Sequence, residues 1–147
     1  MVGAALCTAA AFLPAACRDA PVTTPAPLVP SFRVDVAPVL ERSCATARGC
    51  HGPKPSEVGD LNLRSESSYR ELVSKRAELR PNAIRVEPGQ PERSFLLAKL
   101  SGSLGPDEGK RMPLDPSTRR TLESSGLPDG FVESVLTAWI RAGAPDN

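Results

Sequence analysis

Two cysteines and the only histidine of this 147-residue chain lie close together in residues 42–52, RSCATARGCHG. Cys50 directly precedes His51, as in the ligand end of the CxxCH pattern, in which two cysteine sulfurs form thioethers to a porphyrin and the adjacent imidazole reaches the iron. The other end departs from the pattern, because five residues separate Cys44 from Cys50. The segment therefore predicts haem attachment through a loop of unusual length.

This spacing leaves three chemical outcomes open for the two thiols. The loop could bulge so that both sulfurs form thioethers, Cys50 alone could form one, or Cys44 and Cys50 could form a disulfide without covalent haem. Gly49 and the alanines near it make a compact bulge feasible, since glycine adopts backbone conformations that other residues avoid. A disulfide that closes so short a loop would stabilise the folded state by only about 2 kcal/mol in the chain-entropy model, so it would be a weak structural cross-link.

The sequence offers one further side chain that could bind iron. Haem irons in electron carriers commonly take histidine and methionine from opposite sides of the ring. Apart from Met1, the only methionine is Met112, 61 residues after His51 in the Gly- and Pro-rich segment GSLGPDEGKRMPL. The structural alternatives are an exposed loop histidine and a methionine that fills an apolar gap between loops.

The apolar periodicity predicts a mainly helical fold that would carry these loops. The first helix is expected from about Val36 to Cys44, with Asp35 as its N-cap and Pro38 tolerated in its first turn. This helix leads directly into the cysteine segment. Strand content should be small.

Two short helices are expected between the cysteine segment and Met112. One has its cap at Ser67 or Ser68, and its apolar face consists of Tyr69, Leu72 and Val73. The other begins at Pro91, and its apolar face consists of Phe95, Leu96 and Leu100.

The last helix has the clearest periodicity and carries the only tryptophan. Asp129 is its expected N-cap, Arg141 lies in its last turn and Gly143 follows it. Its apolar residues should pack on the first helix, and they are Phe131, Val132, Val135, Leu136, Trp139 and Ile140.

Charge and composition narrow the functional classes only slightly. The 18 basic and 17 acidic residues give a net charge of +1, so no global charge favours nucleic acid or an anionic membrane surface as partner. Aromatic residues make up 4% of the chain and 16 residues are proline, which indicates a small, loop-rich fold short of large core side chains. A bound cofactor could supply the missing apolar bulk.

The first 17 residues, MVGAALCTAAAFLPAAC, read as an export leader. LPAAC resembles a lipoprotein cleavage site at which Cys17 would be lipidated, with simple cleavage or a retained N-terminal helix as alternatives. No Lys or Arg precedes the apolar run, and Pro14 replaces the usual aliphatic residue, so the translation start could lie upstream. Residues 18–30 are then a Pro-rich tether and residues 31–145 the folded domain. Export would leave Cys44 and Cys50 in an oxidising compartment.

Five short pieces of this chain, in order, resemble a small class I-type cytochrome c, more narrowly the cytochrome-c-like domains of exported proteins and lipoproteins of planctomycetes and myxobacteria. They are FRVDVAPVLERSC leading into CHG, then GDLNL, RVEPGQPERSFLLAKL, KRMPL and VLTAWIRAGAP, and they span about residues 32–145. The resemblance implies a bundle of about four helices around a haem, with the N-terminal helix packed on the C-terminal helix. It also implies that Cys50 and Cys44 are thioether donors, His51 the proximal ligand and Met112 the distal ligand.

The functional expectation is an extracytoplasmic c-type haem protein that carries single electrons between partner proteins of unknown identity and is not an enzyme. The alternative is a haem-free lipoprotein binding module that closes Cys44 to Cys50 on the same scaffold. Several charged residues near the ligand loops have ordinary explanations. Solvated loop charges are expected at Asp107, Glu108 and Asp115, and a positive rim or plain surface at Arg48, Lys54, Lys110 and Arg111.

Overall fold

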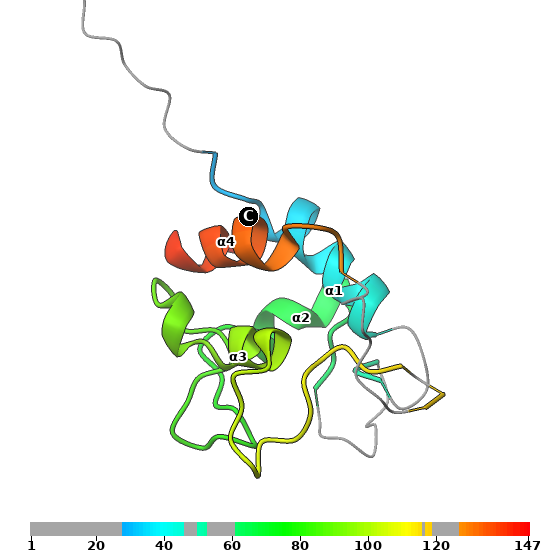
Figure 1. Cartoon of the computed structure of the whole chain (residues 1–147). Coiled ribbons are helices and arrows are strands. Elements are labelled where there is room, and N and C mark those ends of the chain that lie inside the picture. Colours follow the sequence, from blue (N-terminus) through cyan, green and yellow to red (C-terminus); the bar gives the residue numbers. More distant parts are fainter. Residues whose placement is uncertain (1–27, 46–49, 53–60, 116, 119–126) are drawn as a thin grey trace, which may run out of the picture.

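Helices make up most of the regular structure in the computed structural model, which describes residues 28–45, 50–52, 61–115, 117–118 and 127–147 (Figure 1). Within these ranges, pairing between extended segments is limited to isolated bridges such as Val73 with Val86. The expectation of a mainly helical fold is confirmed. In chain order the elements are the π-helical turn η1 (Phe32–Val36), α1 (Ala37–Cys44), α2 (Ser65–Leu72), the 3-10 turn η2 (Pro91–Arg93), α3 (Phe95–Ser101), the π-helical turn η3 (Phe131–Leu136) and α4 (Thr137–Arg141).

The expected leader over residues 1–17 and most of the tether over 18–30 lie outside the described residues. Leu28 and Val29, at the end of the tether, are exposed. Among the helices that the structure describes, none has the length and apolar character needed to cross a bilayer.

The first helix begins at Phe32, four residues before its expected start. Ser31 is the N-cap: its hydroxyl accepts a hydrogen bond from the Val34 N–H at 3.4 Å, and its own N–H donates to the Asp35 carboxylate at 2.7 Å. The expectation that Asp35 is the cap was therefore wrong. Pro38 has no backbone N–H, so it cannot donate the usual α-helical hydrogen bond to the carbonyl of Val34. The turn before it, η1, has the wider hydrogen bonds of a π-helix.

The second helix also begins earlier than expected, because its cap comes from another element. The Glu41 carboxylate of α1 accepts the Ser65 N–H at 3.2 Å and the Ser65 hydroxyl, and it forms an ion pair with Arg64 at 3.3 Å. Neither Ser67 nor Ser68 is the cap, and Ser68 is buried within the helix. Glu41 thus joins α1 to the start of α2.

The remaining helices follow the sequence more closely. Pro91 opens η2 directly before α3, as expected. The N-cap of the last helix is Gly130, which has a φ of 69° and no side chain that could cap the helix. The expected role of Asp129 as N-cap was therefore wrong. Gly143 follows the helix as expected, with φ 97°.

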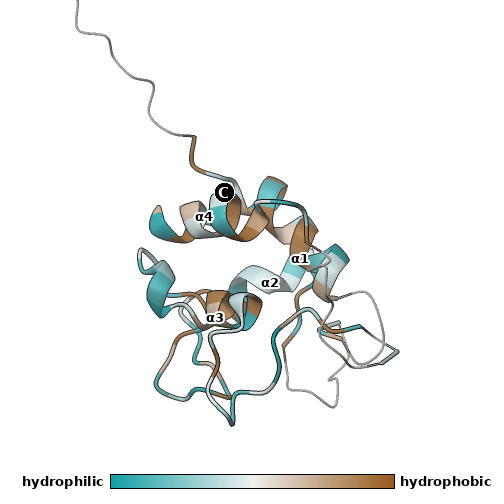
Figure 2. Ribbon diagram, in the orientation of Figure 1, coloured by the Kyte–Doolittle hydropathy of each residue, from teal (hydrophilic) through white to brown (hydrophobic). Residues whose placement is uncertain are grey.

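An aromatic cluster of Phe32, Tyr69 and Trp139 joins the N-terminal and C-terminal helices. The Phe32 ring centroid lies 5.1 Å from each of the other two ring centroids, and Phe32 and Trp139 are both buried. The Tyr69 hydroxyl donates to the Ala144 carbonyl at 3.0 Å, and the Trp139 Nε1–H donates to the Pro145 carbonyl at 2.9 Å. The expected packing of the first helix on the last is therefore present, and Figure 2 shows apolar residues concentrated along α1, α3 and α4.

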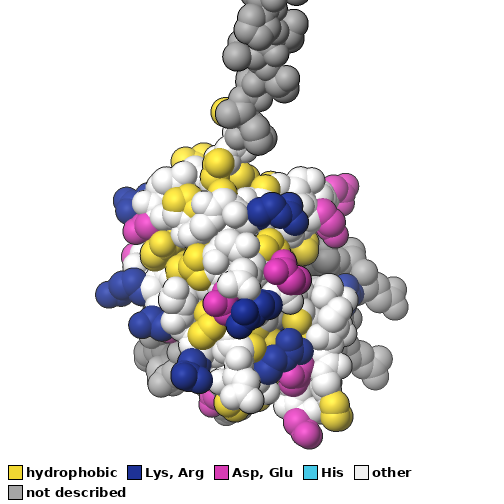
Figure 3. All heavy atoms as spheres, turned by 90° about the vertical axis from the view of Figure 1, so that its left-hand side faces the viewer, with side chains coloured by type: hydrophobic (Ala, Val, Ile, Leu, Met, Phe, Trp, Pro, Cys, Tyr) yellow, Lys and Arg dark blue, Asp and Glu magenta, His cyan; other side chains and the backbone are white. Residues whose placement is uncertain are grey.

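Figure 3 shows one face of the molecule, on which basic and acidic side chains alternate without a patch of one sign. This distribution agrees with the net charge of +1.

We expect Trp139→Ala to lower the free energy of unfolding by about 3–5 kcal/mol, since a fully buried aromatic ring is removed. Chemical denaturation measures this loss. Val34→Ala is the control: the side chain is 74% exposed, so the change should stay within about 0.5 kcal/mol. Equal losses in the two variants would contradict the aromatic cluster as the centre of the core.

Candidate functional site

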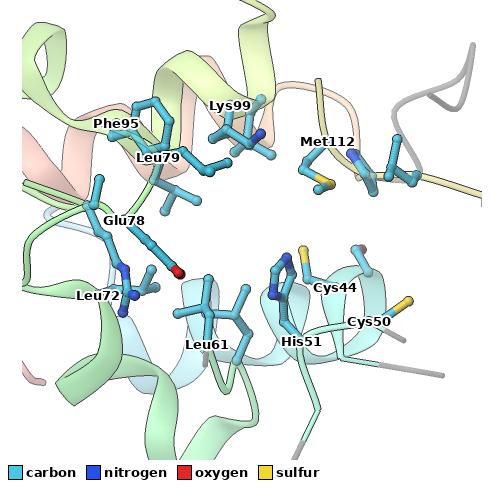
Figure 4. A pocket seen from close by; sticks show the side chains of 18 of the residues that line it. Cys44, Cys50, His51, Leu61, Leu72, Glu78, Leu79, Phe95, Lys99 and Met112 are labelled. Carbon is cyan, nitrogen blue, oxygen red and sulfur yellow. The ribbon is translucent and has the colours of Figure 1, made fainter. Parts of the chain in front are cut away.

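A largely apolar cavity lies between the ends of α1 and α2, one side of α3 and the loop that contains Met112 (Figure 4). It encloses about 1130 Å³ of empty space, including the part that opens to solvent. Its walls are mainly apolar with a few polar groups, as is typical of pockets that bind organic ligands. Its lining residues are Ser43, Cys44, Cys50, His51, Leu61, Leu63, Leu72, Ala77, Glu78, Leu79, Arg85, Phe95, Leu96, Lys99, Leu100, Met112, Pro113, Leu114 and Asp115.

His51 and Met112 line this cavity from opposite sides. Figure 4 shows the imidazole and the thioether sulfur pointing toward one another, the first from the segment after α1 and the second from the loop after α3. Both residues are half-buried, and Met112 also packs against the hydrophobic core. The fold thus brings an imidazole and a thioether, the two donors expected from the sequence, into one apolar space.

The cysteine segment returns to its starting point, so the long spacing does not separate its ends. The His51 N–H donates to the Cys44 carbonyl at 2.9 Å, and the Leu63 N–H donates to the His51 carbonyl at 2.8 Å. His51 is therefore held by its backbone between the end of α1 and the segment that leads into α2. Cys44 and Cys50 are free thiols that both line the cavity. The expected bulge, with Arg48 and Gly49, lies outside the described residues.

Burial and, to a smaller extent, the nearby Cys50 thiol together raise the pKa of the Cys44 thiol to about 12. Removing the Cys44 proton would place a thiolate in the apolar surroundings of the cavity. In the haem-free protein this thiol is therefore protonated at neutral pH.

Polar bonds attach the Met112 loop to α3. Lys99 donates from its Nζ to the carbonyls of Glu108 and Lys110, at 2.9 and 2.8 Å, and its own carbonyl accepts the Met112 N–H at 2.8 Å. The Glu108 carboxylate forms a bidentate ion pair with Arg80, with both N–O distances 2.5 Å. No motif or apolar periodicity of the sequence pointed to Arg80 or Lys99.

Glu108 and Asp115, two of the three carboxylates near Met112, are held in their charged form by hydrogen bonds within the protein. Hydrogen bonds from Arg80 and from the Gly105 N–H hold the pKa of Glu108 at about 2. Hydrogen bonds from the hydroxyl of Ser117 and from two backbone N–H groups hold the pKa of Asp115 at about 2 as well. Asp107 is exposed, as expected.

The expected positive rim remains a prediction. Lys110 is exposed and Arg111 is half-buried in the Met112 loop, whereas Arg48 and Lys54 lie outside the described residues. Arg85 lines the cavity wall and donates to the Glu71 carbonyl at 2.8 Å, a cation that the sequence analysis did not select.

Comparisons of the chain with protein-family models, with curated proteins and with solved structures found no match. The function proposed for this chain therefore rests on the sequence pieces and on the side chains around the cavity.

Cys44 should react slowly with iodoacetamide at pH 8 in haem-free native protein, because alkylation needs the thiolate and the pKa of this thiol is about 12. Peptide mass mapping after timed labelling measures the rate. Labelling in denaturant is the control, and the rate there should be at least tenfold higher. Equal native and denatured rates would contradict the burial of this thiol.

Glu108→Gln should reduce stability most at neutral pH. The folded-state pKa of Glu108 is lowered from 4.5 to about 2, so ionised Glu108 stabilises the fold fully above about pH 4.5 and loses this effect as the pH falls toward 2. Urea unfolding at several pH values should show a difference between wild type and variant that is largest near pH 6, falls to about half at pH 3 and is mostly lost by about pH 2. A difference that does not change with pH would contradict this assignment.

Proposed function

We propose that this chain is an extracytoplasmic c-type haem protein that acts as a one-electron carrier. The observation that carries the proposal is that His51 and Met112, the only histidine and the only methionine beyond Met1, line one cavity from opposite sides. An imidazole and a thioether on opposite sides are a common ligand pair for haem iron in electron carriers.

The residues present fit a haem in three further respects. The leucines in the cavity walls suit a large apolar ring. Cys44 and Cys50 are free thiols in the same wall and are available as thioether donors. Arg85 supplies a cation that could balance the charge of the ring's carboxylates. The finer fold expected from the sequence, a bundle of about four helices around a haem, is part of this proposal.

Each residue would have a defined role. His51 and Met112 would hold the iron, and a bound haem would supply exchange of one electron between the ferric and ferrous states. The Met112 thioether favours the reduced state, so the potential should exceed that of a site with two histidines. If His51 and Met112 both held the iron, the protein would supply both of these ligands and leave no position for a substrate, which supports a carrier rather than an enzyme.

The cellular setting belongs to the same proposal. Covalent haem attachment takes place outside the cytoplasm, which agrees with an export leader over residues 1–17 and with lipidation at Cys17. The partners would be redox proteins, and the protein would reside in the periplasm or cell envelope.

Expression in a periplasm that contains haem-attachment machinery tests the proposal directly. The pyridine haemochrome spectrum and the intact mass should show one covalently attached haem. Cys44→Ser and Cys50→Ser, compared as a matched pair, report whether one or both sulfurs form thioethers. A colourless, folded protein would refute the proposal, and a mass lower by two hydrogens would then favour the binding module with a Cys44–Cys50 disulfide.

Ligand variants complete this experiment. Met112→Ala should abolish the long-wavelength sulfur-to-iron band while covalent haem is retained. Leu79→Ala is the matched control, since Leu79 lines the same cavity without a ligand atom, and it should keep the band. A band that survives in Met112→Ala would refute Met112 as the ligand.

A further inference from the structure

The part of the loop that precedes Met112 buries little of its own surface. Most of residues 101–110 are exposed, and Leu104 is only half-buried. A thioether bound to iron from such a loop depends on whatever fixes the loop beforehand, because ordering the loop costs conformational entropy. The hydrogen bonds and the ion pair of Lys99 and Glu108 are therefore the contacts that can fix this loop.

Lys99 contacts the loop at three points. Its Nζ donates to two loop carbonyls, those of Glu108 and Lys110, at 2.9 and 2.8 Å. Its carbonyl accepts the Met112 N–H at 2.8 Å. One residue of α3 thus fixes both the approach to Met112 and the backbone of Met112 itself, and Figure 4 shows Lys99 and Met112 on the same side of the cavity.

The Glu108 side chain fixes the same loop through a second set of contacts. Its carboxylate binds Arg80 through two N–O contacts of 2.5 Å and accepts the Gly105 N–H at 2.8 Å. Arg80 also donates to the Ser103 carbonyl at 3.3 Å. The ion pair joins the segment after α2 to the loop after α3, and charge-assisted bidentate pairs of this kind hold their geometry better than neutral hydrogen bonds.

Both cations lie against one ring of α3. The Arg80 guanidinium carbon lies 4.7 Å from the centroid of Phe95, and the Lys99 Nζ lies 5.9 Å from it. Phe95 is buried and lines the cavity. The loop is therefore attached to the wall of the site that Met112 faces.

We propose that Lys99 and the Arg80–Glu108 ion pair are positioning residues that hold the Met112 thioether over the cavity and so keep it bound to the iron. This inference rests on the proposed haem site. Partners that orient a metal ligand typically change metal affinity or activity by about 10- to 100-fold when mutated. Without these contacts Met112 should leave the iron more often, and an added ligand should replace it more easily.

The test uses haem-loaded protein and imidazole as the competing ligand. Lys99→Leu removes the Nζ donor without introducing a new iron ligand, and Glu108→Gln removes the charge while keeping the shape. Each variant should bind imidazole about 10- to 100-fold more tightly than wild type and show a weaker sulfur-to-iron band, with unchanged haem content. Glu87→Gln is the matched control, because Glu87 pairs with Arg93 at 3.9 Å, outside this loop, and it should behave as wild type.

A second measurement does not depend on haem. In haem-free protein, hydrogen exchange of the Met112 amide should become faster in Lys99→Leu and Glu108→Gln but not in Glu87→Gln. If wild type attaches haem and both variants keep wild-type imidazole affinity, the positioning role is overturned while the proposed function stands. If wild type attaches no haem, the proposed function fails, and unchanged amide exchange would overturn the attachment of the loop as well.

Discussion

The packing of Phe32 between Tyr69 and Trp139 is the constraint on which the rest of this fold depends. It joins the first helix, α2 and the last helix, which are far apart in the sequence, through ring contacts of 5.1 Å. Once the first helix is fixed in this way, its other end places Cys44 at the cavity, and Glu41 on the same helix caps α2. One end of the first helix thus packs in the apolar core and its other end reaches the candidate site. The packing of the core therefore sets the position of the site.

Local sequence signals predicted the elements better than their boundaries. The last helix and its terminal Gly143 follow from periodicity and backbone preference within one segment. The start of α2 could not be predicted in this way, because its cap is Glu41, 24 residues before Ser65. Asp129 has the right chemistry for a cap, but Gly130 adopts a left-handed conformation at the helix start and no side chain fills that role.

The candidate site shows the same division. The identity of the donors was available from the sequence, because the chain contains so few of them: one histidine and one methionine beyond Met1. The side chains that surround these donors could not be predicted, because they interact with residues that are distant in the sequence and come together only in the folded protein. Glu108 has the appearance of a solvated loop charge until Arg80, 28 residues away, is brought against it. The spacing between Cys44 and His51 along the chain did not decide how close the two residues lie, and the hydrogen bond from the His51 N–H to the Cys44 carbonyl brings them together.

The described chain enters the domain beside its C-terminal residues, where the Ser31 hydroxyl donates to the Asn147 carbonyl at 2.8 Å (Figure 1). The loop after α3 lies at the opposite end of the molecule in the same view. An attachment made upstream of Leu28 would therefore act on the end of the domain opposite the loop after α3. That loop would then face away from the anchored surface.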